Sequence, residues 1–187
     1  MMALTRVPKL NYSQQRMLVE TLGSATAVYE NRHDIMDAIP DATAALRENL
    51  ACMGSCLPRC EEEMEWAEKV KVECIGFHDR RYPVRMKECD DAPMMLYYRG
   101  TADLNKKRIV SMVGTRKITD YGRQMCEVFI RELADLCPDV LIMSGLAYGV
   151  DIQCHRQALQ NGMETIGVLA HGLEQIYPTM HRNTAKE

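Results

Sequence analysis

The amino-acid sequence predicts an α/β protein in which a small all-helical part precedes a doubly wound parallel sheet. Residues 1–71 show helical patterns with start and stop signals, and from residue 72 onward short apolar runs alternate with helical segments. Crossovers that contain a helix are long enough to keep neighbouring strands parallel. We therefore expect a helical domain at 1–71 and an α/β domain at 72–187.

Three helices are expected in the first part. Ser13 offers an N-cap and Gly23 a stop for the first helix, and a second helical pattern, interrupted by a proline, covers residues 33–50. The acidic run Glu61–Glu63 is expected to open the third helix, which ends near Lys71, because negative charge suits a helix N-terminus.

The second part contains three clear strand and helix units. We expect a preliminary strand at 72–77, and the later elements are strands at 108–113, 140–143 and 165–169 and helices at 120–136 and 149–161. In such a sheet, ligands bind at the carboxyl ends of the strands. The loops 114–122, 144–149 and 170–172 are thus expected to line a pocket with backbone N–H groups, as phosphate-binding loops do.

Composition excludes several classes of protein. The chain has 187 residues, of which 47% are hydrophobic, and a net charge of −3. No apolar run approaches the roughly 20 residues of a membrane span, and the N-terminus lacks the apolar core of a signal peptide, so we expect a cytoplasmic protein. The eight cysteines are interpreted as reduced packing thiols, including the regularly spaced Cys52, Cys56 and Cys60, with a metal or redox site as the alternative.

A polyanion would need a local basic patch, because the chain as a whole is acidic. The candidate patch spans 105–123. Its charged residues are Lys106, Lys107, Arg108, Arg116, Lys117 and Arg123, with Asp120 as the one acid.

The first loop of this patch combines groups that suit a phosphate. Gly114 permits close approach of a ligand to the backbone, Thr115 offers a hydroxyl, and Arg116 offers a charged fork of N–H donors. Lys117 is expected to be a second, more exposed cation. The same turn is also compatible with simple tight-turn geometry, with Thr119 or Asp120 as the cap of the next helix.

The second loop carries Ser144, Gly145 and Gly149, followed by Asp151 and His155 four residues apart on one helix face. An Asp–His pair is compatible with proton transfer or with anchoring of the loop. We favour anchoring, because no nucleophile is evidently paired with it. Gly172, which follows the third strand, is the last of the candidate phosphate-binding residues.

Two common signatures are missing from the sequence. The Gly-x-Gly-x-x-Gly turn of dinucleotide-binding domains and the Gly-x-x-x-x-Gly-Lys-Ser/Thr phosphate loop do not occur. Hydride transfer and NTP hydrolysis are therefore not supported. We expect no catalytic residues, cofactor or metal site.

The order and spacing of the motifs resemble the DNA-processing protein A family, also called DprA or Smf, over about three fifths of the chain. The matching segments are Tyr82-Pro83, Asp90–Pro93, Leu96–Gly100, Val113–Arg116, Tyr121-Gly122, Ser144–Asp151, His155, Ala158-Leu159, Thr165–Val168, Gly172 and Tyr177-Pro178.

The resemblance implies a Rossmann-like domain that binds single-stranded DNA and helps to load the RecA recombinase during natural transformation. Arg116 would grip the DNA backbone, with Gly114, Thr115, Ser144 and Gly145 shaping the phosphate pocket. Such binding is expected to weaken steeply with salt and to require no catalysis.

The helical part separately resembles the helix-hairpin-helix or SAM-like domain that members of the family often carry. The segment Val7-Pro-Lys-Leu-Asn11 stands where those modules have a glycine-rich hairpin. Without glycine the backbone cannot approach a phosphate closely, so residues 1–71 are interpreted as a degenerate module for packing or partner contact.

Family members continue past the Tyr177-Pro178 turn, so the chain is interpreted as the helical domain with the first half of the Rossmann-like domain. An incomplete sheet leaves an unpaired edge, which can pair with another chain. The resemblance implies a homodimer, part of whose surface lies in the segments that follow this turn in the family. Two alternatives stay open: a nucleotide-processing enzyme similar to the phosphoribohydrolases, whose Pro-Gly-Gly-x-Gly-Thr-x-x-Glu segment is absent here, and a remnant without DNA binding.

Overall fold

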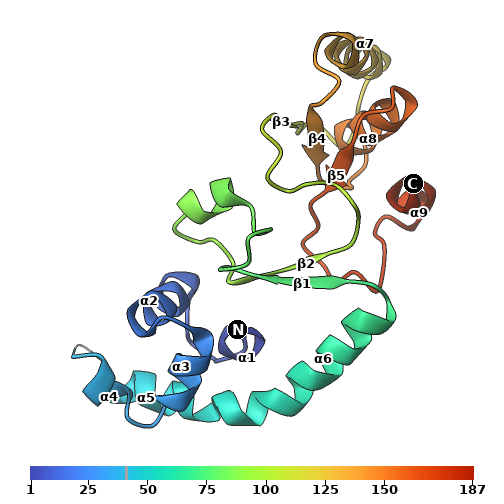
Figure 1. The fold of residues 1–187 in the computed structure, drawn as a ribbon. Helices are drawn as coiled ribbons and strands as arrows, with labels where there is room; N and C mark the ends of the chain where they lie inside the picture. Colours follow the sequence, from blue (N-terminus) through green and yellow to red (C-terminus); the bar gives the residue numbers. More distant parts are fainter. Residues whose placement is uncertain (41) are drawn as a thin grey trace. The chain divides into compact units, whose positions relative to one another are not determined.

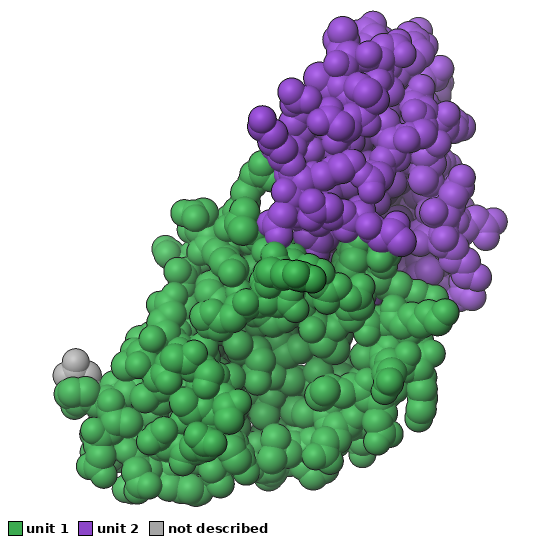
Figure 2. Space-filling view, viewed as in Figure 1, with its two compact units in different colours: residues 1–100 green, residues 101–187 purple. Residues whose placement is uncertain are grey.

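The computed structural model describes residues 1–40 and 42–187, which form two compact units (Figure 2). Unit 1 comprises Met1–Gly100 and unit 2 comprises Thr101–Glu187. The predicted boundary after residue 71 coincides with the change from helices to strands. The strands that directly follow this boundary belong to the same compact unit as the helices.

Unit 1 consists mainly of short helices (Figure 1). They are α1 (Met2–Thr5), α2 (Tyr12–Leu22), α3 (Ala25–Glu30), α4 (Ile35–Ala38), α5 (Ala44–Ala51), the 3₁₀ helix η1 (Cys52–Cys56) and α6 (Leu57–Lys69). After them, β1 (Glu73–Gly76) pairs antiparallel with β2 (Met95–Tyr98), and the 3₁₀ helix η2 (Val84–Glu88) lies between the two strands.

The predicted start of α2 is wrong by two residues. Asn11, not Ser13, is the N-cap: its side chain accepts a hydrogen bond from the N–H of Gln14 at 2.8 Å, and the Gln14 side chain accepts one from the N–H of Asn11 at 3.1 Å. This reciprocal pair satisfies two N–H groups at once, which a serine at position 13 could not do. Gly23 ends the helix as predicted, with a φ of 86°.

The acidic run does not open α6, which is a second correction. The helix begins at Leu57 with Pro58 in its first turn, so Glu61–Glu63 lie in the helix interior. Proline suits this position because the first N–H groups of a helix have no partner within it. Glu63 instead forms an ion pair with Arg59, at 2.6 Å.

Unit 2 confirms the α/β class with a three-stranded parallel sheet in the order β3-β4-β5 (Figure 1). Its elements are β3 (Ile109–Ser111), α7 (Asp120–Leu136), β4 (Leu141–Ser144), α8 (Val150–Gln160), β5 (Thr165–Gly167), the 3₁₀ helix η3 (Thr179–His181) and α9 (Arg182–Lys186). Helix α7 has the predicted bounds, and Thr119 is its N-cap, because the Thr119 side chain accepts from the N–H of Gly122 at 3.1 Å.

The core of unit 2 lies between the sheet and its two crossover helices. Ile130 of α7, Ile142 of β4 and Ala158 of α8 belong to one buried cluster. Because both helices share this cluster with β4, they cover the same face of the sheet, which is half of a doubly wound arrangement. Cys126 and Cys154 are part of the same core, in agreement with the interpretation of cysteines as packing residues.

All eight cysteines are free thiols. Burial raises the pKa of Cys60, and it raises the pKa of Cys154 to about 12. Both thiols are therefore kept in the protonated, unreactive form. Of the helices in the described part of the chain, none has both the length and the hydropathy of a membrane span.

Candidate nucleic-acid interface

The carboxyl ends of the three parallel strands place the predicted loops at one edge of the sheet of unit 2. The register pairs Ser111 with Met143 and Ser144 with Gly167, so the strands end at nearly the same level. The hydroxyl of Ser144 donates to the carbonyl of Met112 at 2.7 Å, which ties the end of β4 to the end of β3. Ser144 is buried and uses its hydroxyl for this bond, so it serves the fold of the loops.

The first loop packs closely against the N-terminus of α8. The N–H of Val150 donates to the carbonyl of Thr115 at 3.1 Å, and the N–H of Lys117 donates to the Thr115 hydroxyl at 3.1 Å. A Cβ on Gly149 would lie 2.0 Å from the Thr115 carbonyl, and one on Gly114 would lie 2.5 Å from Cγ2 of Val150. The two glycines therefore allow the loops to approach each other.

Asp151 and His155 anchor the second loop by separate bonds. The carboxylate of Asp151 accepts from the N–H of Ala147 at 3.4 Å, and Nε2 of His155 lies within hydrogen-bond distance of the carbonyl of Gly145. They bond to the loop and not to each other. The arrangement agrees with the anchoring interpretation of this pair.

The tautomer of His155 follows from its partners. Burial lowers the pKa of His155, so the folded ring is neutral and carries one N–H. The carbonyl of Gly145 can only accept, which places this proton on Nε2. The hydroxyl of Thr165 lies 2.6 Å from Nδ1 and 3.0 Å from the carbonyl of Ile142, and its single proton can serve only one of these two acceptors.

His181 is a third anchor of this loop that could not be identified from the sequence. Its buried imidazole donates from Nδ1 to the carbonyl of Leu146 at 2.7 Å, across 35 positions of the chain. The same ring contacts the ring of Tyr148, with the centroids 5.1 Å apart and an angle of 70° between the planes. No local pattern around Tyr177-Pro178 could have predicted a contact of this sequence separation.

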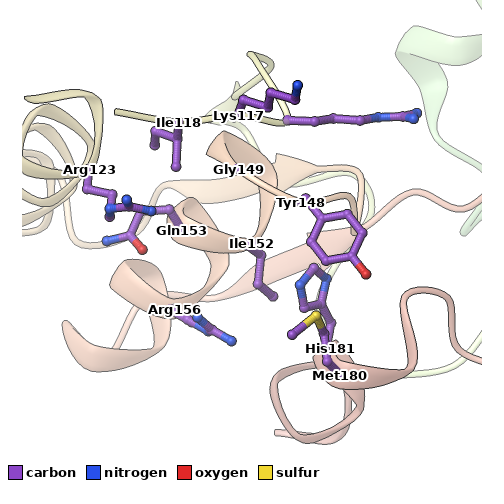
Figure 3. A pocket seen from close by; sticks show the side chains of 11 residues that line it. Lys117, Ile118, Arg123, Tyr148, Gly149, Ile152, Gln153, Arg156, Met180 and His181 are labelled. Carbon is purple, nitrogen blue, oxygen red and sulfur yellow. The ribbon is translucent and has the colours of Figure 1, made fainter. Parts of the chain in front are cut away.

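A pocket of about 380 Å³ opens beside the first two loops (Figure 3). It is lined by Arg116, Lys117, Ile118, Arg123, Tyr148, Gly149, Ile152, Gln153, Arg156, Met180 and His181. Four of these residues are cations and none is an acid. Of the predicted set, the pocket therefore contains Arg116, Lys117 and Gly149, whereas Gly114, Thr115, Ser144 and Gly145 support its walls from outside.

The basic character of the pocket is concentrated in a few side chains. Arg123 forms an ion pair with Asp120 at 3.1 Å. Arg116, Lys117 and Arg156 have no carboxylate within ion-pair distance among the residues described. Arg156 lies on α8, outside the basic patch predicted at 105–123.

Part of the predicted patch is engaged elsewhere. Lys106 forms an ion pair with Glu164, and Arg108 forms one with Asp139 at 3.0 Å. The lining of the pocket therefore identifies the cations available to an anion in unit 2 better than the predicted patch 105–123 does.

The third predicted loop does not contribute to the pocket. Gly172 is absent from its lining, and a Cβ at this position would lie 2.1 Å from the carboxylate of Glu174. The Glu174 carboxylate thus lies beside the backbone of Gly172, and its negative charge disfavours a phosphate there. Within 1–40 and 42–187, no group of three or more His, Cys, Asp or Glu side chains is arranged to hold a metal ion.

Fold and pocket together define a class of protein: a Rossmann-like α/β protein with a cationic pocket at the carboxyl ends of its strands. Residues 73–187 match the family described as DNA recombination-mediator protein A. The chain belongs to this family, which includes the DprA and Smf proteins and confirms the resemblance derived from the motifs.

Several relatives carry such names. The chain is 39% identical over 112 residues to the DNA processing protein DprA of Streptococcus pneumoniae, covering 60% of this chain and 39% of that protein. It is 34% identical over 108 residues to DprA of Bacillus subtilis, covering 57% of this chain and 36% of that protein. The chain thus spans less than half the length of these relatives.

The fold is shared with a solved member of the family. The X-ray structure of DprA from Streptococcus pneumoniae superimposes with a TM-score of 0.70 at 26% identity, covering 99% of this chain and 62% of that one. The likeness supports the Rossmann-like fold of the parallel sheet.

Proposed function

We propose that this chain binds single-stranded DNA through the pocket of unit 2, as part of a DNA-processing protein that acts in recombination. The observation that carries the proposal is the set of three cations, Arg116, Lys117 and Arg156, which line one concavity and have no carboxylate within ion-pair distance among the described residues. The names of the relatives, which are DNA processing proteins, support the same conclusion.

The charge of the pocket suits a phosphodiester backbone. Arginine offers a planar fork of donors to phosphate oxygens, and lysine adds a compact charge. Each phosphate neutralised releases counterions, so affinity for a single strand falls with salt by a slope of about 0.7 per contact. The overall charge of −3 disfavours long-range attraction of nucleic acid, which leaves this pocket as the source of affinity.

The proposed role is binding without a chemical step. The imidazoles of His155 and His181 donate their N–H groups to the carbonyls of Gly145 and Leu146, respectively, in the second loop. These imidazoles hold the loop in place, which is a structural use of a group that enzymes use for proton transfer. We further propose, on the basis of the family resemblance, that the bound strand is passed to the RecA recombinase in the cytoplasm, with a homodimer as the assembled form.

A titration with labelled oligonucleotides tests the binding role. The full chain, Arg116→Ala and Arg131→Ala are each titrated against single-stranded and double-stranded oligonucleotides at low salt, with fluorescence anisotropy as the readout. Arg131 is the matched control, because it is an exposed arginine of α7 that does not line the pocket.

We expect the parent and Arg131→Ala to prefer the single strand, and Arg116→Ala to bind it about tenfold or more weakly, the loss typical of a charge-assisted hydrogen bond. Equal binding by parent and Arg116→Ala, or equal affinity for both forms of DNA, would contradict the proposal. Release of free base from a nucleoside monophosphate would instead support the enzyme alternative.

A further inference from the structure

We infer that Tyr148 is the nucleobase platform of the pocket: its ring stacks on a base of the strand whose phosphates bind the neighbouring cations. This inference rests on the proposed function, because the tyrosine and the cations line the same cavity. The stacking contact depends neither on charge nor on which base is present, and it requires bases that are not paired in a duplex.

The ring of Tyr148 is available to a ligand. Tyr148 is 43% exposed, and its side chain lies on the pocket wall beside His181 (Figure 3). Tyr82 shows the opposite use of a tyrosine: it is fully buried, and its hydroxyl donates to the carbonyl of Pro93 at 2.6 Å. The hydroxyl of Tyr148 has no hydrogen-bond partner among the described residues, so the fold does not depend on it.

The backbone on both sides of Tyr148 is held in place. The N–H of Ala147 is bound by the carboxylate of Asp151, at 3.4 Å, and the N–H of Val150 is bound by the carbonyl of Thr115, at 3.1 Å. A backbone that is already held by hydrogen bonds loses little further conformational entropy when a ligand binds, which is the benefit of a preorganised site.

The orientation of the ring leaves a face open. The imidazole of His181 meets the tyrosine ring at an angle of 70°. In a near-perpendicular contact, either the edge of the imidazole points at one tyrosine face or the tyrosine edge points at the imidazole. In both cases at least one face of Tyr148 stays clear of His181.

The cations lie close enough for one nucleotide to use both kinds of contact. Arg116, Lys117 and Arg156 line the same cavity of about 380 Å³ as the ring. Tyr148 and the exposed side chain of Met180 give this cavity apolar surface among its charges. A base with its attached phosphate matches this mixture, whereas a phosphate alone leaves the apolar surface unused.

The test compares an oligothymidylate with an abasic oligonucleotide of the same length. Both carry the same phosphates, and the oligothymidylate alone carries bases. The full chain, Tyr148→Leu, Tyr148→Phe and the control Tyr12→Leu are titrated with each ligand at fixed salt. Tyr12 is a suitable control because it is 48% exposed and does not line the pocket.

We expect the parent, Tyr148→Phe and Tyr12→Leu to bind the oligothymidylate more tightly than the abasic strand. Tyr148→Leu should bind the oligothymidylate roughly five- to a hundredfold more weakly than the parent does, the range of one stacking contact. Its affinity for the abasic strand should equal that of the parent, which also shows that the variant is folded.

Other outcomes separate the inference from the function on which it rests. If Tyr148→Leu keeps the parent's preference for bases, or if the parent binds both ligands equally, the assignment of Tyr148 is overturned while phosphate binding stands. If the parent binds neither ligand, the proposed function is wrong and the inference falls with it.

Discussion

The imidazole of His181 donates a hydrogen bond from Nδ1 to the carbonyl of Leu146, at 2.7 Å. This bond fixes the middle of the loop 145–149 from a segment that follows the cis peptide bond Tyr177-Pro178. Asp151 and His155 hold the neighbouring peptide groups of the same loop. The conformation of the second loop therefore depends on three side chains outside it.

Removal of the His181 side chain should loosen this loop. His181→Ala leaves a buried carbonyl without a donor, which typically costs about 1–3 kcal/mol. We expect faster amide hydrogen exchange at Ala147 and Val150, measured by NMR or mass spectrometry, and weaker binding of single-stranded DNA. His181→Asn keeps an N–H donor and should recover part of the protection. Unchanged exchange in His181→Ala would show that the bond does not hold the loop.

Gly149 should tolerate substitution far less well than Gly162. Both have a positive φ, 82° and 69°, but a Cβ on Gly162 meets nothing within 4 Å, whereas one on Gly149 lies 2.0 Å from the Thr115 carbonyl. Gly162→Ala should cost about 1–2 kcal/mol of unfolding free energy, the conformational term alone. Gly149→Ala should cost about 1–3 kcal/mol more, because the new Cβ would overpack the first loop and because a ψ of −124° lies outside the left-handed helical region. Urea unfolding followed by circular dichroism measures both, and equal costs would contradict the close packing of the two loops.

The stability of unit 2 should depend on pH through His155. Burial lowers the pKa of His155 below its ordinary 6.5, against the opposing charge of Asp151. As the pH falls below about 6.5, the unfolded chain takes up a proton that the folded chain does not, so the unfolding free energy decreases by at most about 1.4 kcal/mol per pH unit until the folded pKa is reached.

The variant His155→Gln provides the control for this pH dependence. Its amide can still donate to the Gly145 carbonyl, but it does not titrate. The difference in unfolding free energy between parent and variant should therefore shrink as the pH is lowered from 7.5 to 5.5. A difference that is constant over this range would show that the pKa of His155 is not lowered by folding.

Arg156 should contribute to DNA binding although it lies outside the predicted basic patch. It lines the pocket from α8, next to Gln153 and Ile152. Arg156→Gln should weaken binding of a single strand several-fold and make the salt dependence shallower by about 0.7 in slope, the value for one phosphate contact. Arg131→Gln serves as the control. If both substitutions weaken binding equally, the effect comes from the overall charge of the protein and not from a binding site that includes Arg156.

Much of unit 2 could be predicted because its signals are local. The apolar periodicity and the cap at Thr119 lie next to each other in sequence, so the bounds of α7 were predicted correctly. The placement of the first two loops follows from topology, since parallel strands end at one edge of the sheet. Arg116 and Lys117 were thus expected where the pocket lies.

Other features could not be predicted because they depend on competition or on distant contacts. Asn11 and not the predicted Ser13 is the N-cap of α2, because Asn11 forms a reciprocal pair of hydrogen bonds with Gln14. Asparagine and serine have similar N-cap propensities, so propensity alone does not distinguish them. The bond of His181 to Leu146 spans 35 positions.

A salt series tests most directly whether the pocket around Arg116 binds the phosphates of single-stranded DNA. Binding of a labelled oligothymidylate by the full chain and by Arg116→Ala is measured at several salt concentrations, and the logarithm of the affinity is plotted against the logarithm of the salt concentration. We expect a negative slope for the parent and, for Arg116→Ala, a lower affinity with a slope shallower by about 0.7. Coincident lines for the two proteins would contradict this expectation.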